Sequence, residues 1–230
     1  MQNLFSPPDE GVFQGQSNDN VELLIAWAGT TLAYALYPYR ANFAAMLTPG
    51  FASALLISGL VCGLGFVLHE LAHRVVARGY GAQAHFIANK QMLIMSIVIA
   101  LAGLFLAAPG AVWYRGSLTK AQNGKIALAG PVANFVLSIL FFIPLAVVIV
   151  GHRTAPDWAL NLCYAGFSLN GWLGLFNMIP AGPFDGAKVL VWSPLVFGIT
   201  VAVGAFLAFG LQNQAVLNFL LNLVTPLVGA

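Results

Sequence analysis

The chain has 230 residues, of which 60% are hydrophobic and 7% are charged, and its mean hydropathy is +0.85. Because a soluble globular domain carries about 25% charged residues, this composition excludes an ordinary soluble protein and predicts an integral membrane protein. The net charge of +2 says little about partners, and no nucleic-acid partner is expected. The length leaves room for about six membrane-spanning helices of roughly 20 residues each.

The chain opens with a polar segment, MQNLFSPPDEGVFQGQSNDN (1–20), which we predict to be a flexible tail. It lacks the basic stretch and apolar core of a secretory signal peptide. Residues 21–230 are predicted to form a single transmembrane domain, in which Cys62 and Cys163 are small buried hydrophobic residues. The apolar stretches long enough to span a membrane are 21–38, 51–78, 91–110, 125–150, 158–180, 189–209 and 212–229.

The positions of the basic residues predict how these stretches are oriented. Seven of the nine lie in three places, which the positive-inside rule assigns to the cytoplasmic side. Both ends of the stretch 91–110 carry such charges, so we expect it to enter the membrane and return on the same side, as a re-entrant or β-hairpin segment. A seventh spanning helix is the alternative. The predicted fold is therefore an all-α polytopic membrane protein with about six transmembrane helices. The seven basic residues are Arg74, Arg78, Lys90, Arg115, Lys120, Lys125 and Lys188.

Residues 67–76 read VLHELAHRVV and place ionisable side chains inside an apolar run. Such groups are costly in a membrane and usually mark a functional site. On a helix, His69 and His73 lie on one face and can bind one metal ion, while Glu70 points beside that face. This H-E-x-x-H pattern is typical of zinc metalloproteases, in which the Glu acts as general base. A coincidental pair of hydrogen-bonded histidines is the alternative, in a chain with only four His.

A catalytic zinc ion usually has three protein ligands, so a third must be found. Asp185 is the best candidate, because it lies in the segment NMIPAGPFDGAKVL, directly after the apolar stretch 158–180. His85 and His152 lie in or near predicted loops and are expected to be solvated. Another divalent ion could replace zinc, since affinity alone does not select the metal.

The predicted topology tests this choice. His69 and His73 are expected near the cytoplasmic end of their helix, and Asp185 near a cytoplasmic end as well. An even number of crossings must then separate the two sites. This condition holds only if the stretch 91–110 does not cross the membrane, which is the topology that the basic residues predict.

Together, HELAH (69–73) and NMIPAGPFDG (177–186) resemble the site-2 protease family of intramembrane zinc metalloproteases. The second segment matches the family pattern N-x-x-P-x-x-P-x-D-G at every fixed position, and GPVAN (130–134) is similar to the family's G-P-x-x-N. The resemblance covers residues 21–190, with a catalytic core at 51–190. One departure is APGAV (108–112), which has a single Gly where the family commonly has a Gly-Gly hairpin.

The resemblance implies that His69, His73 and Asp185 are zinc ligands and that Glu70 is the catalytic acid and base. It also implies that the substrate is a spanning helix of another membrane protein. That helix would be cut within the lipid bilayer or at its cytoplasmic edge. The chain would then be a multi-pass protein of the cell membrane with its active site towards the cytoplasm.

Two asparagines lie in the motifs that carry this resemblance. Asn134 and Asn177 would contact the substrate or stabilise the oxyanion. An interhelical hydrogen bond is the alternative for Asn134, and for Asn177 a helix cap or turn is expected first and a substrate contact second. An inactive metal-binding scaffold and an ion transporter are the alternatives to a protease, although few ionisable residues other than those named lie inside the apolar stretches.

Overall fold

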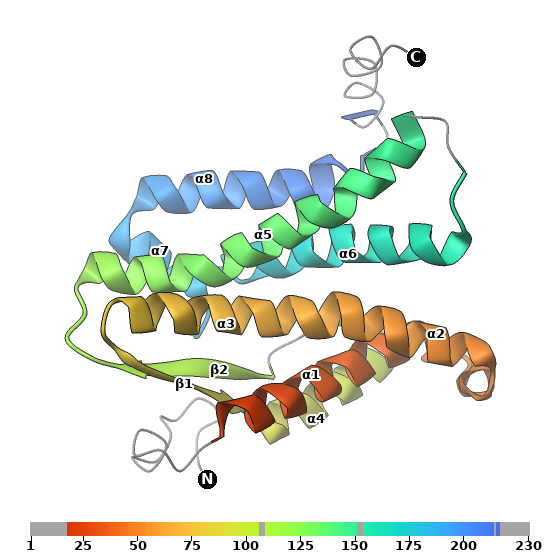
Figure 1. The fold of residues 1–230 in the computed structure, drawn as a ribbon, viewed down its shortest axis with the longest axis horizontal. Coiled ribbons are helices and arrows are strands. Elements are labelled where there is room, and N and C mark those ends of the chain that lie inside the picture. Colours follow the sequence, from red (N-terminus) through yellow and green to blue (C-terminus); the bar gives the residue numbers. More distant parts are fainter. Residues whose placement is uncertain (1–17, 106–108, 151–153, 214, 217–230) are drawn as a thin grey trace.

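The computed structural model describes residues 18–105, 109–150, 154–213 and 215–216, and these are largely helical. Short 3-10 helices follow α1, and the π-helices Gly59–Gly63 and Phe206–Gly210 continue α2 into α3 and extend α8. The elements in Figure 1 are α1 (Asp19–Leu36), α2 (Pro49–Ser58), α3 (Leu64–Gly79), β1 (Gln83–Ala88), α4 (Lys90–Leu101), β2 (Gly110–Arg115), α5 (Lys120–Val150), α6 (Asp157–Phe176), α7 (Asp185–Trp192) and α8 (Pro194–Ala205).

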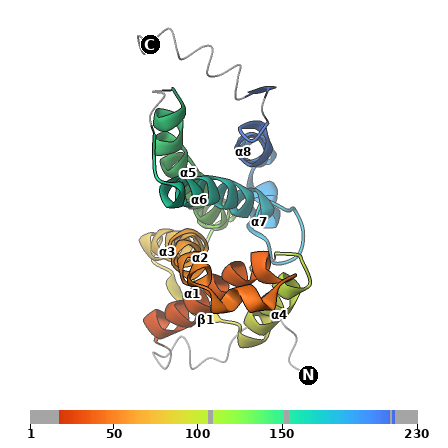
Figure 2. The same cartoon turned by 90° about the vertical axis from the view of Figure 1, so that its right-hand side faces the viewer.

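Helix α3 lies between two groups of elements. On one side are α1, α4 and the two-stranded sheet, and on the other side are α5, α6, α7 and α8, as Figures 1 and 2 show. Helix α5 packs against α3, and it also packs against α6 and α7. Segments that are distant in the sequence therefore meet around α3.

Buried apolar side chains fix α3 on both of these sides. Phe66 packs edge to face on Phe86 of β1, with 5.8 Å between the ring centroids. Further along the helix, Ala77 belongs to a buried cluster with Ala84 of β1 and Ile126 of α5. A fully buried Phe stabilises a fold by about 1.5–3 kcal/mol. This packing holds the HELAH segment between the sheet and α5.

Two of the described helices are long and apolar enough to cross a membrane. They are Pro49–Gly79, with 31 residues, and Lys120–Val148, with 29 residues, and an 18-residue stretch in each has a mean hydropathy of 2.3. Length and composition alone are weak support for a membrane, because the core helix of a soluble protein passes the same test. In these two helices, however, only 39% and 22% of the apolar 18-residue stretch is buried inside the protein. A large exposed apolar surface is typical of a membrane or partner contact.

The described residues thus contain two such helices, where about six were predicted. The stretch 189–209 is divided into α7 and α8, because Ser193 caps α8 by accepting the N–H of Val196 (3.3 Å). Pro194 follows in the first turn of α8, where its missing N–H is tolerated. The stretch 212–229 lies almost wholly outside the described residues.

The structure bears on two smaller predictions. Of the predicted tail, residues 1–17 lie outside the described residues, and α1 already begins at Asp19 because Asn18 caps it by accepting the N–H of Asn20 (3.1 Å). Cys62 is buried as predicted, whereas Cys163 is only partly buried.

The stretch 91–110 is not itself a β-hairpin. It contains α4, whose 12 residues extend only about 18 Å and cannot cross a hydrocarbon core of about 30 Å. The antiparallel pair is formed by the strands on either side of α4, with Ala88 opposite Gly110. Asn89 ends β1 and caps α4 by accepting the N–H of Met92 (3.0 Å), and this cap outweighs the strand propensity of the β-branched residues that follow.

The chain nevertheless returns to the place from which it leaves the sheet. Asn89 donates its N–H to the carbonyl oxygen of Pro109 at 2.7 Å, so the two ends of the segment between the strands lie side by side. A re-entrant segment requires this return. The position of the segment relative to a membrane stays a prediction.

Candidate metal centre

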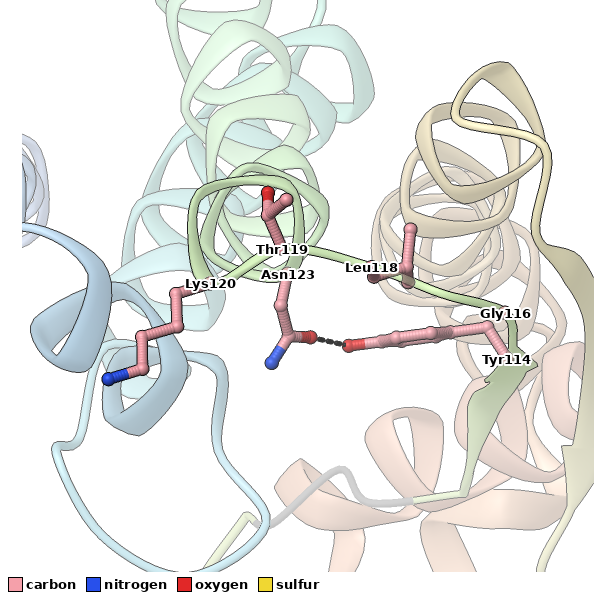
Figure 3. A pocket seen from close by; sticks show the side chains of 6 residues that line it. All are labelled: Tyr114, Gly116, Leu118, Thr119, Lys120 and Asn123. Carbon is pink, nitrogen blue, oxygen red and sulfur yellow. Dashed lines mark hydrogen bonds between the residues drawn. The ribbon is translucent and has the colours of Figure 1, made fainter.

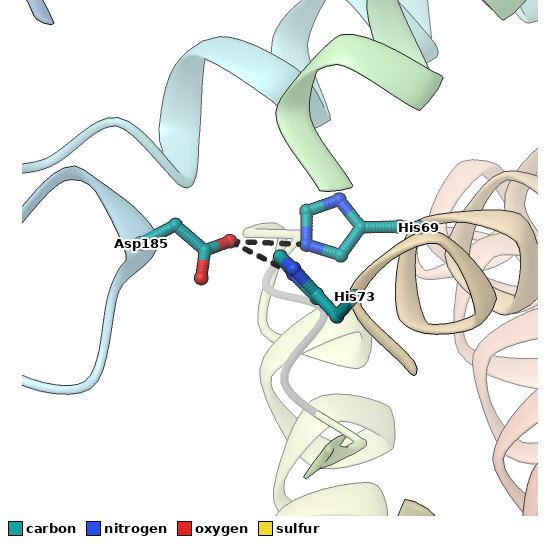
Figure 4. Close-up of side chains that lie close together, drawn as sticks. All are labelled: His69, His73 and Asp185. Carbon is teal, nitrogen blue, oxygen red and sulfur yellow. Dashed lines mark ion pairs between the residues drawn. The ribbon is translucent and has the colours of Figure 1, made fainter. Parts of the chain in front are cut away.

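Helices α3 and α7 bring three potential metal ligands together. His69 and His73, one turn apart on α3, face Asp185, the first residue of α7, as Figure 4 shows. The Oδ2 atom of Asp185 lies 3.2 Å from Nε2 of His69 and 3.1 Å from Nε2 of His73. All three residues are buried. The structure thus places the predicted third ligand beside the predicted pair.

The separations of these atoms suit a tetrahedral zinc site. At zinc–ligand bond lengths of about 2.0–2.1 Å, two ligand atoms of a tetrahedron lie about 3.3 Å apart. The two His–Asp separations of 3.2 Å and 3.1 Å are close to this value. One ligand atom from each residue lies within 4.8 Å of the other two. Two imidazoles and a carboxylate are also a donor set that zinc accepts, so the residues fit the predicted zinc ion.

Gly130 of α5 leaves room for this cluster. A Cβ atom at Gly130 would lie 2.4 Å from Nε2 of His73 and 2.5 Å from Nε2 of His69, closer than real Cβ contacts. Only a glycine therefore lets α5 approach the two ligand nitrogens so closely. In the sequence, Gly130 is the first residue of the GPVAN segment, and no sequence pattern predicts that it lies against the two histidines.

Hydrogen bonds at the far side of each imidazole set its orientation. Nδ1 of His73 lies 2.7 Å from the carbonyl oxygen of Ile126, and Nδ1 of His69 lies 2.6 Å from Oδ1 of Asn134. Both partners accept hydrogen bonds, so both Nδ1 atoms carry the proton, and the lone pairs of the Nε2 atoms face Asp185. Partners of this kind commonly orient metal-binding histidines.

Asn134 belongs to a buried amide network. Its Nδ2 donates to the carbonyl oxygen of Gly65 (3.1 Å) and to Oδ1 of Asn170 (3.0 Å), and Asn170 donates in turn to the carbonyl oxygen of Gly166 (2.9 Å). The interhelical hydrogen bond considered for Asn134 is therefore present. A role as oxyanion donor stays a prediction, since both amide hydrogens are already donated. Asn170 was missed, although an Asn inside an apolar stretch was a signal for it.

The segment after α6 carries Asp185 into the site. Asn177 ends α6, where its Nδ2 donates to the carbonyl oxygen of Leu173 (3.0 Å). Its own carbonyl oxygen accepts the N–H of Gly186 (2.8 Å), which ties the start of α7 to the end of α6. A Cβ atom at Gly186 would lie 2.1 Å from the carbonyl oxygen of Met178, so a glycine is needed for this close approach. Asn177 is thus a helix cap, and a substrate contact stays a prediction.

Glu70 lies next to the cluster and not within it. Its Oε2 atom accepts the N–H of Val112 of β2 at 3.1 Å, so the carboxylate is held against the sheet. His85 lies in β1 and contacts Asp19 at 2.9 Å, away from the three ligands. His152 lies outside the described residues.

Comparison with known proteins assigns the family. The chain is 43% identical over 154 residues to "Putative zinc metalloprotease MJ0611" of Methanocaldococcus jannaschii. The alignment covers 66% of this chain and 78% of that protein. This chain belongs to that family of zinc metalloproteases. This chain is also 31% identical to "Zinc metalloprotease MJ0392" of Methanocaldococcus jannaschii and to "Putative zinc metalloprotease Rip3" of Mycobacterium tuberculosis. These alignments cover 54% and 60% of the chain but only 30% and 31% of the two relatives. No protein-family profile and no solved structure matches it.

Burial and neighbouring charges both act on the carboxyl groups at the metal centre of the metalloprotease. Burial alone would raise the pKa of the Asp185 carboxyl, but the two facing imidazoles, when they are protonated at Nε2, outweigh burial and hold its pKa below the usual range. Lys188, one turn after Asp185, is among the charges that act on Glu70. The centre therefore favours an ionised carboxylate at Asp185, which is the form that binds a metal.

Asn134→Ala is expected to weaken zinc binding by roughly 10- to 100-fold, because His69 loses the partner that orients its ring. Zinc affinity would be measured by competition with a chelating dye. Ser138→Ala is the matched control, since Ser138 also joins α5 to α6 by a buried hydrogen bond, to the carbonyl oxygen of Phe167 (2.8 Å), but touches no ligand. Equal zinc affinity in both variants would contradict the orienting role of Asn134.

Proposed function

We propose that this metalloprotease cleaves peptide bonds within, or at the cytoplasmic edge of, transmembrane segments of other membrane proteins, as the site-2 protease family does. The observation that carries the proposal is the position of the ligands. His69 and His73 lie within the apolar helix Pro49–Gly79, which is long enough to span a membrane. At a rise of about 1.5 Å per residue they lie about 9–15 Å from the end of that helix at Gly79.

The residues of the site support hydrolysis. A zinc ion at His69, His73 and Asp185 would supply Lewis acidity, which polarises a peptide carbonyl and makes water easier to deprotonate. Glu70 takes a proton from the attacking water as the new carbon–oxygen bond forms. When the carbon–nitrogen bond breaks, Glu70 returns this proton to the leaving amine.

The outer edge of β2 offers a place for the substrate. Opposite residues of an antiparallel pair alternate between exchanging backbone hydrogen bonds and pointing their backbone groups outward. The bond between Asn89 and Pro109 fixes this alternation, and Val112 accordingly donates its N–H outward, to Glu70. The residues of β2 that face outward are Gly110, Val112 and Tyr114.

A helical substrate must unwind before it is cut, because its carbonyl groups are bonded within the helix. We propose that the unwound segment pairs with this outer edge as an added strand. The bond to be cut would then lie beside Glu70. The lipid bilayer would deliver the substrate laterally. The positions of the basic residues support a site towards the cytoplasmic face of the cell membrane, by the positive-inside rule.

The test is cleavage of a reporter transmembrane segment by the purified protein in liposomes, with a water-soluble peptide of the flanking sequence as control. We expect cleavage of the reporter, its loss on chelation, and its recovery when zinc is added back. Cleavage of the soluble peptide alone would contradict an intramembrane substrate. If zinc binds but neither the reporter nor the soluble peptide is cut, an inactive scaffold is favoured. Zinc-dependent ion flux across the liposome membrane would favour a transporter.

A further inference from the structure

A cavity of about 270 Å³ lies where the chain passes from β2 into α5. Figure 3 shows its lining, with Tyr114 from the strand and Asn123 from the helix facing each other. The hydroxyl of Tyr114 donates to Oδ1 of Asn123, so the amide nitrogen of Asn123 remains without a hydrogen-bond partner among the described residues. The lining residues are Tyr114, Gly116, Leu118, Thr119, Lys120 and Asn123.

Two lysines give this cavity a positive charge. Lys120 lines it, and Nζ of Lys188 lies 5.6 Å from the centre of the Tyr114 ring. In the described part of the chain neither lysine forms an ion pair, although the charge of Lys188 acts on Glu70. The cavity therefore offers several hydrogen-bond donors and positive charge to a ligand.

The cavity lies at a defined distance from the reacting groups. Val112 touches Glu70, and Tyr114 is two residues further along the same outer edge of β2. Two residues of a strand extend about 7 Å. If a substrate strand pairs with this edge and its cleaved bond lies beside Glu70, a side chain two residues from that bond lies over Tyr114.

We propose that this cavity is a side-chain subsite for an acidic residue of the substrate, Asp or Glu, two residues from the cleaved bond. The inference rests on the proposed intramembrane protease function. Lys188, Lys120 and the amide of Asn123 would donate to the carboxylate. A lipid headgroup is another source of negative charge. Arg115 and Lys125 are exposed cations better placed for it, as is Lys120, whereas Lys188, Tyr114 and Asn123 are half-buried.

The first experiment measures binding without cleavage. Glu70→Gln protein, in zwitterionic liposomes, is titrated with fluorescent peptides of the unwound reporter segment that carry Glu, Gln or Lys two residues from the mapped cleavage bond. The Glu peptide is expected to bind about fivefold more tightly than the Gln peptide, as a single partly exposed ion pair allows, and the Lys peptide is expected to bind most weakly. Equal binding of the three peptides would overturn the subsite.

The second experiment measures cleavage of the corresponding reporters. The active protein should cut the Glu reporter about fivefold faster than the Gln reporter, mainly through KM. Lys188→Gln should remove most of this preference, and Lys188→Glu should reverse it towards the Lys reporter. Lys125→Gln, which changes an exposed cation on the same helix as Lys120, should keep the preference of the unaltered protein.

Three outcomes separate the possible failures. Cleavage with no preference for Glu overturns the subsite and leaves the protease. A preference for the Glu peptide in binding, with no cleavage by the active protein, supports the subsite and overturns the protease. If Lys188→Gln slows all reporters equally, and only in liposomes with anionic lipid, the lysine binds headgroups and the subsite is overturned.

Discussion

Replacing Glu70 by Gln is expected to slow reporter cleavage by at least about a thousandfold, within the range of effects of removing a general acid and base. Gln cannot take a proton from water at neutral pH, although its carbonyl oxygen can still accept the N–H of Val112. Glu70 is not among the three residues that can hold the metal, so bound zinc should stay near one ion per chain. Reporter cleavage and zinc content would be measured on the same preparation.

Glu22→Gln is the matched control for this variant. Glu22 also accepts a backbone N–H of the sheet, from Ala88 at 3.0 Å, but it belongs to α1 and lies away from the three ligands. This change should leave both zinc content and cleavage nearly unaltered. If Glu70→Gln kept the full rate, another residue would be the base. If it lost its zinc, Glu70 would be a ligand and the roles assigned to the HELAH segment would be wrong.

Most of the metal centre could be predicted because its residues follow spacing rules. Two histidines one helical turn apart must share a face, and a carboxylate in an apolar protein is rare enough to be found by elimination. The residues that support the ligands follow no such rule. Gly130 acts through the absence of a Cβ atom, Ile126 acts through its backbone carbonyl, and Asn170 contacts His69 only through Asn134.

The fold was predicted less well than the site, for a physical reason. Hydropathy identifies an apolar stretch but does not say where the stretch breaks. Ser193 and Pro194 divide one predicted span into two helices, and Asn89 turns a strand-like sequence into a helix through its cap. The contact between Val112 and Glu70 was beyond prediction, since it depends on the register of β1 and β2.

Gly130→Ala is expected to weaken zinc binding by more than about 100-fold, beyond the usual effect of changing a residue that merely supports a ligand. The new methyl group would lie 2.4–2.5 Å from both Nε2 atoms, so it would occupy space that the zinc and its ligands need. Because α5 packs against α3, α6 and α7, it cannot retreat without disturbing other contacts. Zinc content, zinc affinity and reporter cleavage would all be measured.

Gly198→Ala distinguishes a local clash from a general effect of altering a helical glycine. Gly198 lies in α8, and a Cβ atom there would meet nothing within 4 Å, so this change should alter stability by no more than about 1 kcal/mol and leave zinc bound. Alanine also favours the helix at position 130, so the Gly130→Ala protein should keep its helical content while it loses zinc. Full zinc affinity in that protein would mean that α5 does not approach the histidines as closely as the structure places it. Loss of zinc with intact helices would instead show that the missing side chain of Gly130 is as necessary to the centre as the imidazoles that it faces.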